Sequence, residues 1–285
     1  MRIGKYFTMA ANRKYWLLLL VAALVAVACV IPGCSPASTQ VQTKENIEFT
    51  TEEAQYSATY FCSLFDELDS KVNGGKGYSE YLNTDGFPTG ALLAWSESKL
   101  MQAYANMYEV TCDVKYADKL HEHILAVMAN RDDKIGKSDY KGELVPSWGA
   151  TKYSRNKEYT HNLLLTSLIT YPMLEFIDLA RENRLEYQDT NEILKQVEES
   201  ISSFPEEWVV NKNGGYYQFA DDSPIAYGQK MVPTNSFAAA GRCFVLLHKL
   251  TGKAEYLERA AELAKTFKHS LVADKNGAYI WGYRL

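Results

Sequence analysis

The chain of 285 residues carries 30 Lys and Arg side chains against 35 Asp and Glu, which gives a formal net charge of −5 at pH 7. Residues 1–33 hold basic side chains and no acidic ones, so the remainder is more acidic still. This balance argues against nucleic acid or anionic lipid as the partner, because both attract proteins through basic side chains. The sequence also contains no phosphate-binding loop, dinucleotide fingerprint or serine nucleophile elbow.

The N-terminal segment has the pattern of a secretion signal. Basic residues precede an uncharged apolar run over residues 15–31, which leads into Ile31-Pro32-Gly33-Cys34. This tetrapeptide resembles the lipobox of bacterial lipoproteins, in which cleavage leaves an acylated cysteine as the first residue. We therefore expect residues 1–33 to be a lipoprotein-type signal peptide and Cys34 to be lipidated, with the protein tethered to a membrane of the bacterial cell envelope outside the cytoplasm. An uncleaved anchor helix is the alternative, because the run is close to the length that spans a bilayer.

Residues 34–48 are small, polar and unpatterned over most of their length, which predicts a flexible tether. The folded domain is expected to occupy residues 49–285. Its first helix is predicted to start at the capping box Thr50-Thr51-Glu52-Glu53 and to end at the breaker Asn73-Gly74-Gly75.

Six further helices are predicted from apolar periodicity, at residues 91–110, 114–129, 159–183, 191–204, 235–250 and 254–271. Between them lie long loops rich in Gly, Asp and aromatic residues, at 77–89, 131–157 and 211–233, and the last is expected to form a small β-ribbon. Long aromatic loops on a helical scaffold are where its binding surface is usually found. Residues 277–285 are apolar, aromatic and strand-like.

A helical-hairpin motif occurs twice in the chain. An apolar helix ends at Thr111 and at Thr251, and in each copy a tight turn leads to a tyrosine five positions later, Tyr116 and Tyr256. A degenerate third copy leads to Tyr187, so the tyrosines lie about 70 residues apart. Such a repeat predicts an array of stacked hairpins.

We therefore expect an all-α fold of the helical-hairpin (α/α) toroid type, with small β-ribbon loops. A closed ring of about six hairpins needs on the order of 400 residues. The chain is shorter, which predicts a partial or open ring. Either another surface closes that ring, or the chain is a fragment of a longer protein.

Several short motifs resemble bacterial α/α-toroid proteins related to the C-terminal domain of D-glucuronyl C5-epimerases. They are residues 93–98, 130–133, 145–148, 160–161, 233–235, 241–242 and 279–283. The resemblance implies a protein that acts on a polysaccharide, with uronate-containing polymers among the candidates, as an epimerase-, lyase- or hydrolase-like enzyme. The alternatives are a non-catalytic glycan-binding or assembly subunit, or an inactive fragment of a longer enzyme.

A glycan cleft should combine aromatic faces with carboxylate, amide and guanidinium groups. The residues expected to bind substrate are Asp85, Trp95, Trp148, Asn235, Arg242, Trp281 and Tyr283. Trp95 and Trp281 fit a place in the core equally well. We expect these side chains to line one rim of the ring, where the long loops lie, with the short turns at 112–113 and 252–253 on the other.

Three residues are candidates for catalysis. Glu97, beside Trp95, is a candidate proton donor, and His161 with Tyr153 could act as base and acid at C5 of a uronate, the pairing that epimerisation or β-elimination requires. Structural roles are the alternatives, with Glu97 near a helix start and His161 as a core histidine.

No cofactor and no metal are expected. His121 and His123 are two residues apart on a helix, so they point in different directions and do not form a zinc site. Cys62, Cys112 and Cys243 lie among apolar helical residues, which favours free buried thiols over a disulfide framework.

Overall fold

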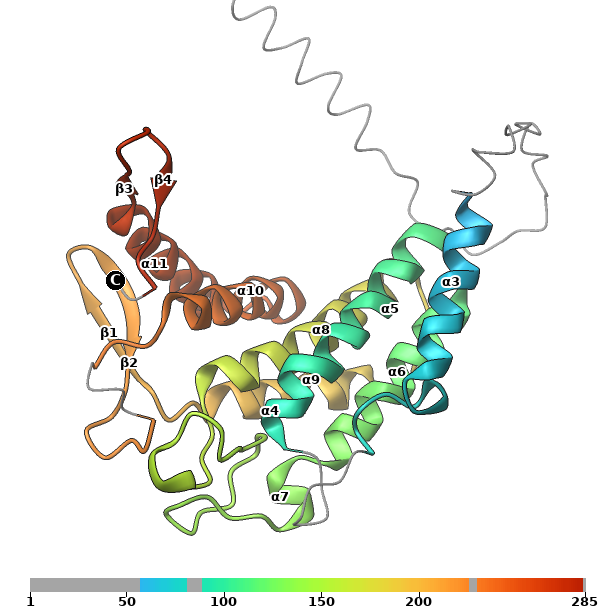
Figure 1. Cartoon of the computed structure of the whole chain (residues 1–285), viewed down its shortest axis with the longest axis horizontal. Coiled ribbons are helices and arrows are strands. Elements are labelled where there is room, and N and C mark those ends of the chain that lie inside the picture. The colour runs from blue at the N-terminus through green and yellow to red at the C-terminus, as the bar shows by residue number, and fades with distance from the viewer. Residues whose placement is uncertain (1–56, 81–88, 226–229, 284–285) are drawn as a thin grey trace, which may run out of the picture. The chain divides into compact units, whose positions relative to one another are not determined.

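A computed structural model describes residues 57–80, 89–225 and 230–283. The predicted signal peptide, the tether, Cys34, the capping box at 50–53 and Asp85 lie outside these ranges. Figure 1 shows the arrangement of the elements.

Three helical hairpins and one additional helix make up most of the described chain. The hairpins are α5 (Ser98–Thr111) with α6 (Val114–Ala129), α8 (Leu163–Glu182) with α9 (Thr190–Ser202), and α10 (Thr234–Thr251) with α11 (Ala254–Ser270); helix α3 (Ala58–Lys71) precedes them. Helix α8 packs against both α5 and α10, so the first helices of the hairpins form one row (Figure 1). Each second helix covers the first helix of its own hairpin. This is the predicted open (α/α) array.

Short elements connect the hairpins. They are η1 (Asn73–Gly75), α4 (Gly90–Leu92), the π-helical turn η2 (Leu93–Glu97), α7 (Asp132–Ile135) and η3 (Arg155–Lys157). Strand β1 (Glu207–Asn211) pairs antiparallel with β2 (Gly214–Gln218), and β3 (Val272–Ala273) pairs with β4 (Tyr279–Ile280). The predicted ribbon therefore exists, but it starts earlier than residue 211, because the polar stretch that begins at Asn211 forms its turn.

Helix α8 is the most buried element of the array. It begins at Leu163 rather than at the predicted residue 159, because the Asn162 side chain caps it by accepting a hydrogen bond from the Leu165 N–H at 2.9 Å. Its length and composition would suffice to cross a membrane, yet 72% of its most apolar window is buried inside the protein. A helix that is apolar on most sides and covered by neighbours on several sides is typical of a core.

The sequence repeat corresponds to a repeated contact between hairpins. The hydroxyls of Tyr116, Tyr187 and Tyr256 donate to the carboxylates of Asp66 at 3.0 Å, Asp118 at 2.7 Å and Glu198 at 2.8 Å, respectively. The three acceptors lie on α3, α6 and α9. Each tyrosine therefore binds a helix that precedes its own hairpin turn or loop in the chain and lies outside the row formed by α5, α8 and α10. Tyr116 and Tyr256 are buried, as predicted from their shared position, whereas Tyr187 is half-buried because it lies in the loop before α9.

The turns of the first and third hairpins are also equivalent. The Thr111 hydroxyl accepts from Asp113 N–H at 3.1 Å, and the Thr251 hydroxyl accepts from Lys253 N–H at 3.2 Å. Cys112, between Thr111 and Asp113, and Gly252, between Thr251 and Lys253, both have a left-handed backbone conformation.

The cysteines follow the prediction in part. Cys243 is a buried free thiol, and Cys62 is free and half-buried. Cys112 is exposed in its turn, so the expectation of a buried thiol is wrong there.

Candidate functional site

A cavity of about 850 Å³ lies at the N-terminal ends of α8 and α10. Its wall combines aromatic and aliphatic side chains with amides, a hydroxyl and one carboxyl. The lining residues are Trp95, Tyr153, Asn162, Leu164, Glu206, Phe219, Ile225, Val232, Pro233, Asn235, Ser236 and Tyr283. The loops at 131–157 and 211–233 thus meet at one place, as predicted for two of the three long loops, while most of the third, residues 81–88, lies outside the described ranges.

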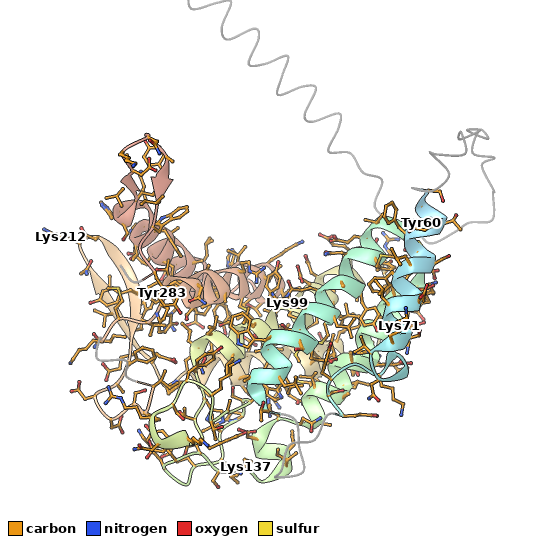
Figure 2. All side chains as sticks on the ribbon, in the orientation of Figure 1. Tyr60, Lys71, Lys99, Lys137, Lys212 and Tyr283 are labelled. Carbon is orange, nitrogen blue, oxygen red and sulfur yellow. The ribbon has the colours of Figure 1, made fainter. Side chains whose placement is uncertain are left out.

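Backbone hydrogen bonds hold these segments together. Arg155 N–H donates to Pro224 O at 2.8 Å, which joins the two long loops directly. Thr234 N–H donates to Tyr283 O at 2.9 Å, which fixes the last described residues at the start of α10. Figure 2 shows Tyr283 between the β1–β2 ribbon and α10. The wall is therefore assembled from distant parts of the sequence.

Gly90 and Gly149 allow the start of α4 to approach the loop before α8. Gly90 N–H donates to Gly149 O at 2.9 Å. A Cβ atom on Gly90 would lie 2.3 Å from Trp148 O, and one on Gly149 would lie 2.4 Å from the Tyr159 ring. Side chains larger than hydrogen are therefore excluded at both positions.

Three aromatic side chains at the cavity keep part of their surface exposed. Trp95 is 40% exposed, Tyr153 38% and Tyr283 69%. Trp95 lies in the π-helical turn η2, a distortion that often re-aims side chains at functional sites. Tyr153 has φ of +74°, a left-handed conformation that is costly for a residue with a side chain.

Glu206 is the one carboxyl group that lines the cavity among the described residues. It is only 7% exposed, and both of its oxygens lie 3.0 Å from the N–H of Leu163 at the start of α8. Burial raises the pKa of Glu206 to about 7, while the hydrogen bond from Leu163 acts in the opposite direction. The cost of burying the charge outweighs the helix N-terminus that would stabilise it.

Sequence reasoning missed Glu206. It stands beside Glu207, which is exposed on β1, and the two glutamates look alike in the sequence. Glu206 lies in the bend just before β1, where the alternation of strand side chains does not apply, so no local pattern marked it.

Four of the residues predicted for the site line the cavity: Trp95, Tyr153, Asn235 and Tyr283. Asn235 is exposed in the first turn of α10. Asp85 lies outside the described residues.

Glu97 does not reach the cavity. It is fully buried, accepts a hydrogen bond from Tyr78 N–H at 2.5 Å and lies 2.5 Å from Nδ1 of His123. His123 also contacts the hydroxyl of Tyr104, which donates to Asp69 on α3. The π-helical turn places Trp95 at the cavity and Glu97 in the packed interior, so the prediction that Glu97 lines the cleft is wrong.

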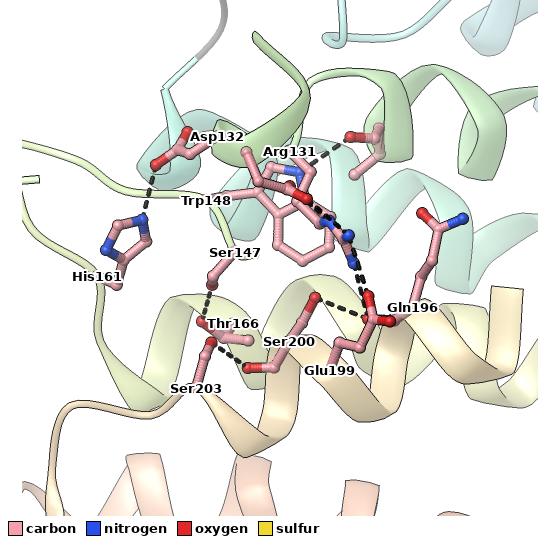
Figure 3. A network of polar contacts seen from close by, with 12 residues as sticks. Arg131, Asp132, Ser147, Trp148, His161, Thr166, Gln196, Glu199, Ser200 and Ser203 are labelled. Carbon is pink, nitrogen blue, oxygen red and sulfur yellow. Dashed lines mark hydrogen bonds and ion pairs between the residues drawn. The ribbon is translucent and has the colours of Figure 1, made fainter. Parts of the chain in front are cut away.

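His161 and Trp148 are also internal (Figure 3). Nε2 of His161 lies 2.7 Å from Asp132, which accepts further hydrogen bonds from Gly149 N–H and Tyr159 OH. Trp148 donates its indole N–H to Val127 O at 2.9 Å. Both side chains fix the loop before α8 to the core, so the prediction that they line the cleft is wrong. The neighbour of His161, Asn162, faces the cavity instead.

Arg242 and Trp281 lie near the cavity but outside its lining. The Arg242 guanidinium packs 3.9 Å above the Tyr171 ring and borders a smaller, apolar cavity of about 410 Å³ between α10 and α11. Trp281 donates to Phe267 O at 3.1 Å and packs against the Phe267 ring. Their predicted places in the cleft are therefore wrong: Arg242 lies about two turns beyond Asn235, and Trp281 fastens the C-terminal strand to α11.

The two neighbouring histidines of α6 have different partners. His121 binds Asp189 at 2.9 Å, while His123 binds Glu97. No group of three or more His, Cys, Asp or Glu side chains suited to a metal ion occurs within the described ranges.

No protein-family model matches the chain, and no curated protein matches it in sequence. Among solved structures, it is similar to one described as the crystal structure of D-mannose isomerase, with a TM-score of 0.39 and 17% sequence identity. The match covers 66% of this chain and 45% of that chain, so this chain corresponds to less than half of that protein's length.

Proposed function

We propose that the cavity binds a sugar ring and that the protein acts on a carbohydrate. The supporting observation is the set of partly exposed aromatic side chains, Trp95, Tyr153 and Tyr283, around a cavity that also presents the amides of Asn162 and Asn235. The C–H faces of sugars stack on aromatic rings, and sugar hydroxyls need fixed hydrogen-bonding partners. The cavity volume of about 850 Å³ is also in the range of small-ligand sites.

The substrate we propose is a polysaccharide that includes acidic units. Support for the acidic units comes from two cations outside the cavity lining: Lys99, labelled in Figure 2, and Arg242, which borders the smaller cavity. Lys99 lies one helical turn after Trp95, and Arg242 lies two turns after Asn235, so both follow cavity residues on the same helix faces. Burial and, after it, the nearby Arg242 lower the pKa of Lys99, while the nearby Glu175 acts in the opposite direction. A glycan that runs from the cavity along α5 and α10 would bring its carboxylates toward these cations.

A non-catalytic glycan-binding protein is the second candidate. It is favoured by the positions of Glu97 and His161, the residues expected to perform chemistry, because both are hydrogen-bonded inside the core. The binding prediction below is common to both candidates, and the two differ only in whether the bound sugar is changed.

Replacing Trp95 with alanine should weaken sugar binding about tenfold or more, because a stacked indole face contributes roughly 1–2 kcal/mol. Binding would be measured by calorimetry with D-mannose, N-acetyl-D-glucosamine, D-glucuronate and short oligouronates. The matched control is Trp281→Ala, which removes an indole of similar exposure outside the cavity. Equal binding by the Trp95→Ala variant and the unaltered protein, or no binding of any of these sugars, would contradict the proposal.

We also propose that the protein is a lipid-anchored component of the bacterial cell envelope, on the evidence of its N-terminal sequence. Mass spectrometry of the mature protein should show a diacylated or triacylated Cys34 as its first residue. A Cys34→Ser variant should lose this modification and should no longer partition with membranes. A mature chain that starts elsewhere without a lipid would contradict this assignment.

A further inference from the structure

We propose that Glu206 is the acid–base group of the cavity and exchanges a proton with a carbon atom of the bound sugar. This inference rests on the proposed function, since it needs a sugar in the cavity. It concerns a residue to which the sequence motifs assign no role.

Among the buried carboxylates of the described residues, Glu206 alone has no basic partner there. Glu97 is held by His123, and Asp132 is held by His161. Among the described residues, the Glu206 carboxylate accepts hydrogen bonds only from backbone N–H groups, chiefly that of Leu163. A buried carboxylate without a cationic partner is costly, and such groups are concentrated at functional sites. Glu206 can therefore gain or lose a proton without breaking an ion pair.

The groups packed around Glu206 also leave it free to titrate. Helix α8 presents the Leu163 N–H, and strand β2 presents Tyr217, whose hydroxyl is hydrogen-bonded to Arg259 of α11 at 3.2 Å. None of the cavity-lining residues in the described ranges is a Lys, Arg or His. With burial raising the pKa of Glu206 to about 7, both protonation states are available near neutral pH, which is the condition for efficient proton transfer.

The chemistry available to one such group is proton transfer at carbon. The ionised Glu206 removes a proton from a C–H next to a carbonyl or carboxyl group of the sugar, and the electron pair of that bond moves to the carbonyl oxygen. Amide N–H groups of Asn162 or Asn235 can stabilise the resulting oxyanion. Glu206, now a carboxylic acid, returns the proton to the same carbon as the carbonyl re-forms, or to the adjacent carbon after the neighbouring hydroxyl has passed its own proton to the oxyanion and become the new carbonyl, so no external oxidant or reductant is required.

Glycoside hydrolysis fits this wall less well. Most glycosidases use two carboxyl groups that flank the scissile bond. The described lining supplies one.

The experiment follows deuterium incorporation by proton NMR while the full-length protein is incubated in D₂O with the sugars that it binds, from the same panel. The unaltered protein should catalyse exchange of a carbon-bound hydrogen. Glu206→Gln should reduce the exchange rate about 100-fold or more, since it cannot ionise. The matched control is Glu207→Gln, which makes the same chemical change one residue away on an exposed side chain that accepts a hydrogen bond from Gln218.

A second variant and a direct titration guard against loss of folding. Glu206→Asp keeps an ionisable group and should retain part of the exchange activity, and circular dichroism checks that each variant is folded. The ¹³C signal of the Glu206 carboxyl, identified by its loss in Glu206→Gln, should titrate near neutral pH. Its midpoint should shift when a sugar binds.

The outcomes separate this inference from the proposed function. Wild-type exchange by folded Glu206→Gln, or sugar binding without exchange by the unaltered protein, overturns the role of Glu206 and leaves the binding site intact. If no sugar binds at all, the proposed function fails and the role of Glu206 falls with it.

Discussion

Replacing Tyr116 with alanine is expected to lower the free energy of unfolding by about 3 kcal/mol, the usual cost of removing a buried aromatic side chain. Tyr116 is 2% exposed, its ring packs edge-on against Phe65, and its hydroxyl donates to Asp66. Tyr256→Ala should have a similar effect, because its ring stacks on Phe244 and its hydroxyl donates to Glu198. Denaturant unfolding of the purified domain measures both.

Two matched variants identify the source of this effect. Tyr116→Phe keeps the ring and loses only the hydrogen bond to the half-exposed Asp66, so it should cost about 1 kcal/mol or less. Tyr187→Ala should cost less than Tyr116→Ala, since Tyr187 is half-buried. Losses below about 1 kcal/mol for alanine at both Tyr116 and Tyr256 would show that these contacts do not hold the hairpins together.

Glu206→Gln is expected to remove a large pH dependence of stability. The folded state raises the pKa of Glu206 to about 7 from the ordinary 4.5, so folding favours the protonated form. The stabilisation is complete below about pH 4.5 and is lost as the pH rises through 7. One pKa unit corresponds to about 1.4 kcal/mol, so this loss amounts to about 3 kcal/mol.

Urea unfolding of both proteins between pH 4.5 and 8.5 tests this expectation. Glutamine has nearly the same shape and can still accept from Leu163 N–H, but it does not titrate. Relative to the unaltered protein, Glu206→Gln should therefore gain about 3 kcal/mol across this range. Glu207→Gln should show no such gain, because Glu207 is exposed. A stability difference between Glu206→Gln and the unaltered protein that does not change with pH would mean that Glu206 is ionised in the folded state throughout.

The helices could be predicted well from the sequence because their signals are local. The predicted helix at 114–129 coincides with α6, and the turns after Thr111 and Thr251 follow from a Thr and a left-handed residue at fixed positions. Errors occurred where a side chain, rather than periodicity, decides the boundary. Asn162 delays the start of α8, and residues 159–161 before it are extended because Thr160 pairs with Ala150.

The site was less predictable because its residues depend on contacts between distant segments. Trp148 and His161 are residue types common in glycan clefts. Both are buried in the core, where Trp148 is hydrogen-bonded to Val127 and His161 to Asp132. No local pattern distinguishes a tryptophan that stacks on a ligand from one that fills a core. The loops were correctly expected to meet because chain topology, rather than a particular side chain, determines where they lie.

The π-helical turn at Leu93–Glu97 makes the cavity wall sensitive to chain length at that point. Each residue of an α-helix is rotated by about 100° around the axis from the one before it. The one extra residue in the wider turn therefore determines the direction in which side chains before the turn point, relative to those of α5. A gene shorter by a single codon here could keep the packing of Met101, Tyr104 and Tyr108 unchanged. It would nevertheless rotate a different side chain into the place of Trp95. A one-residue gap between related sequences would therefore change the side chains that a ligand meets in the cavity without disturbing the core.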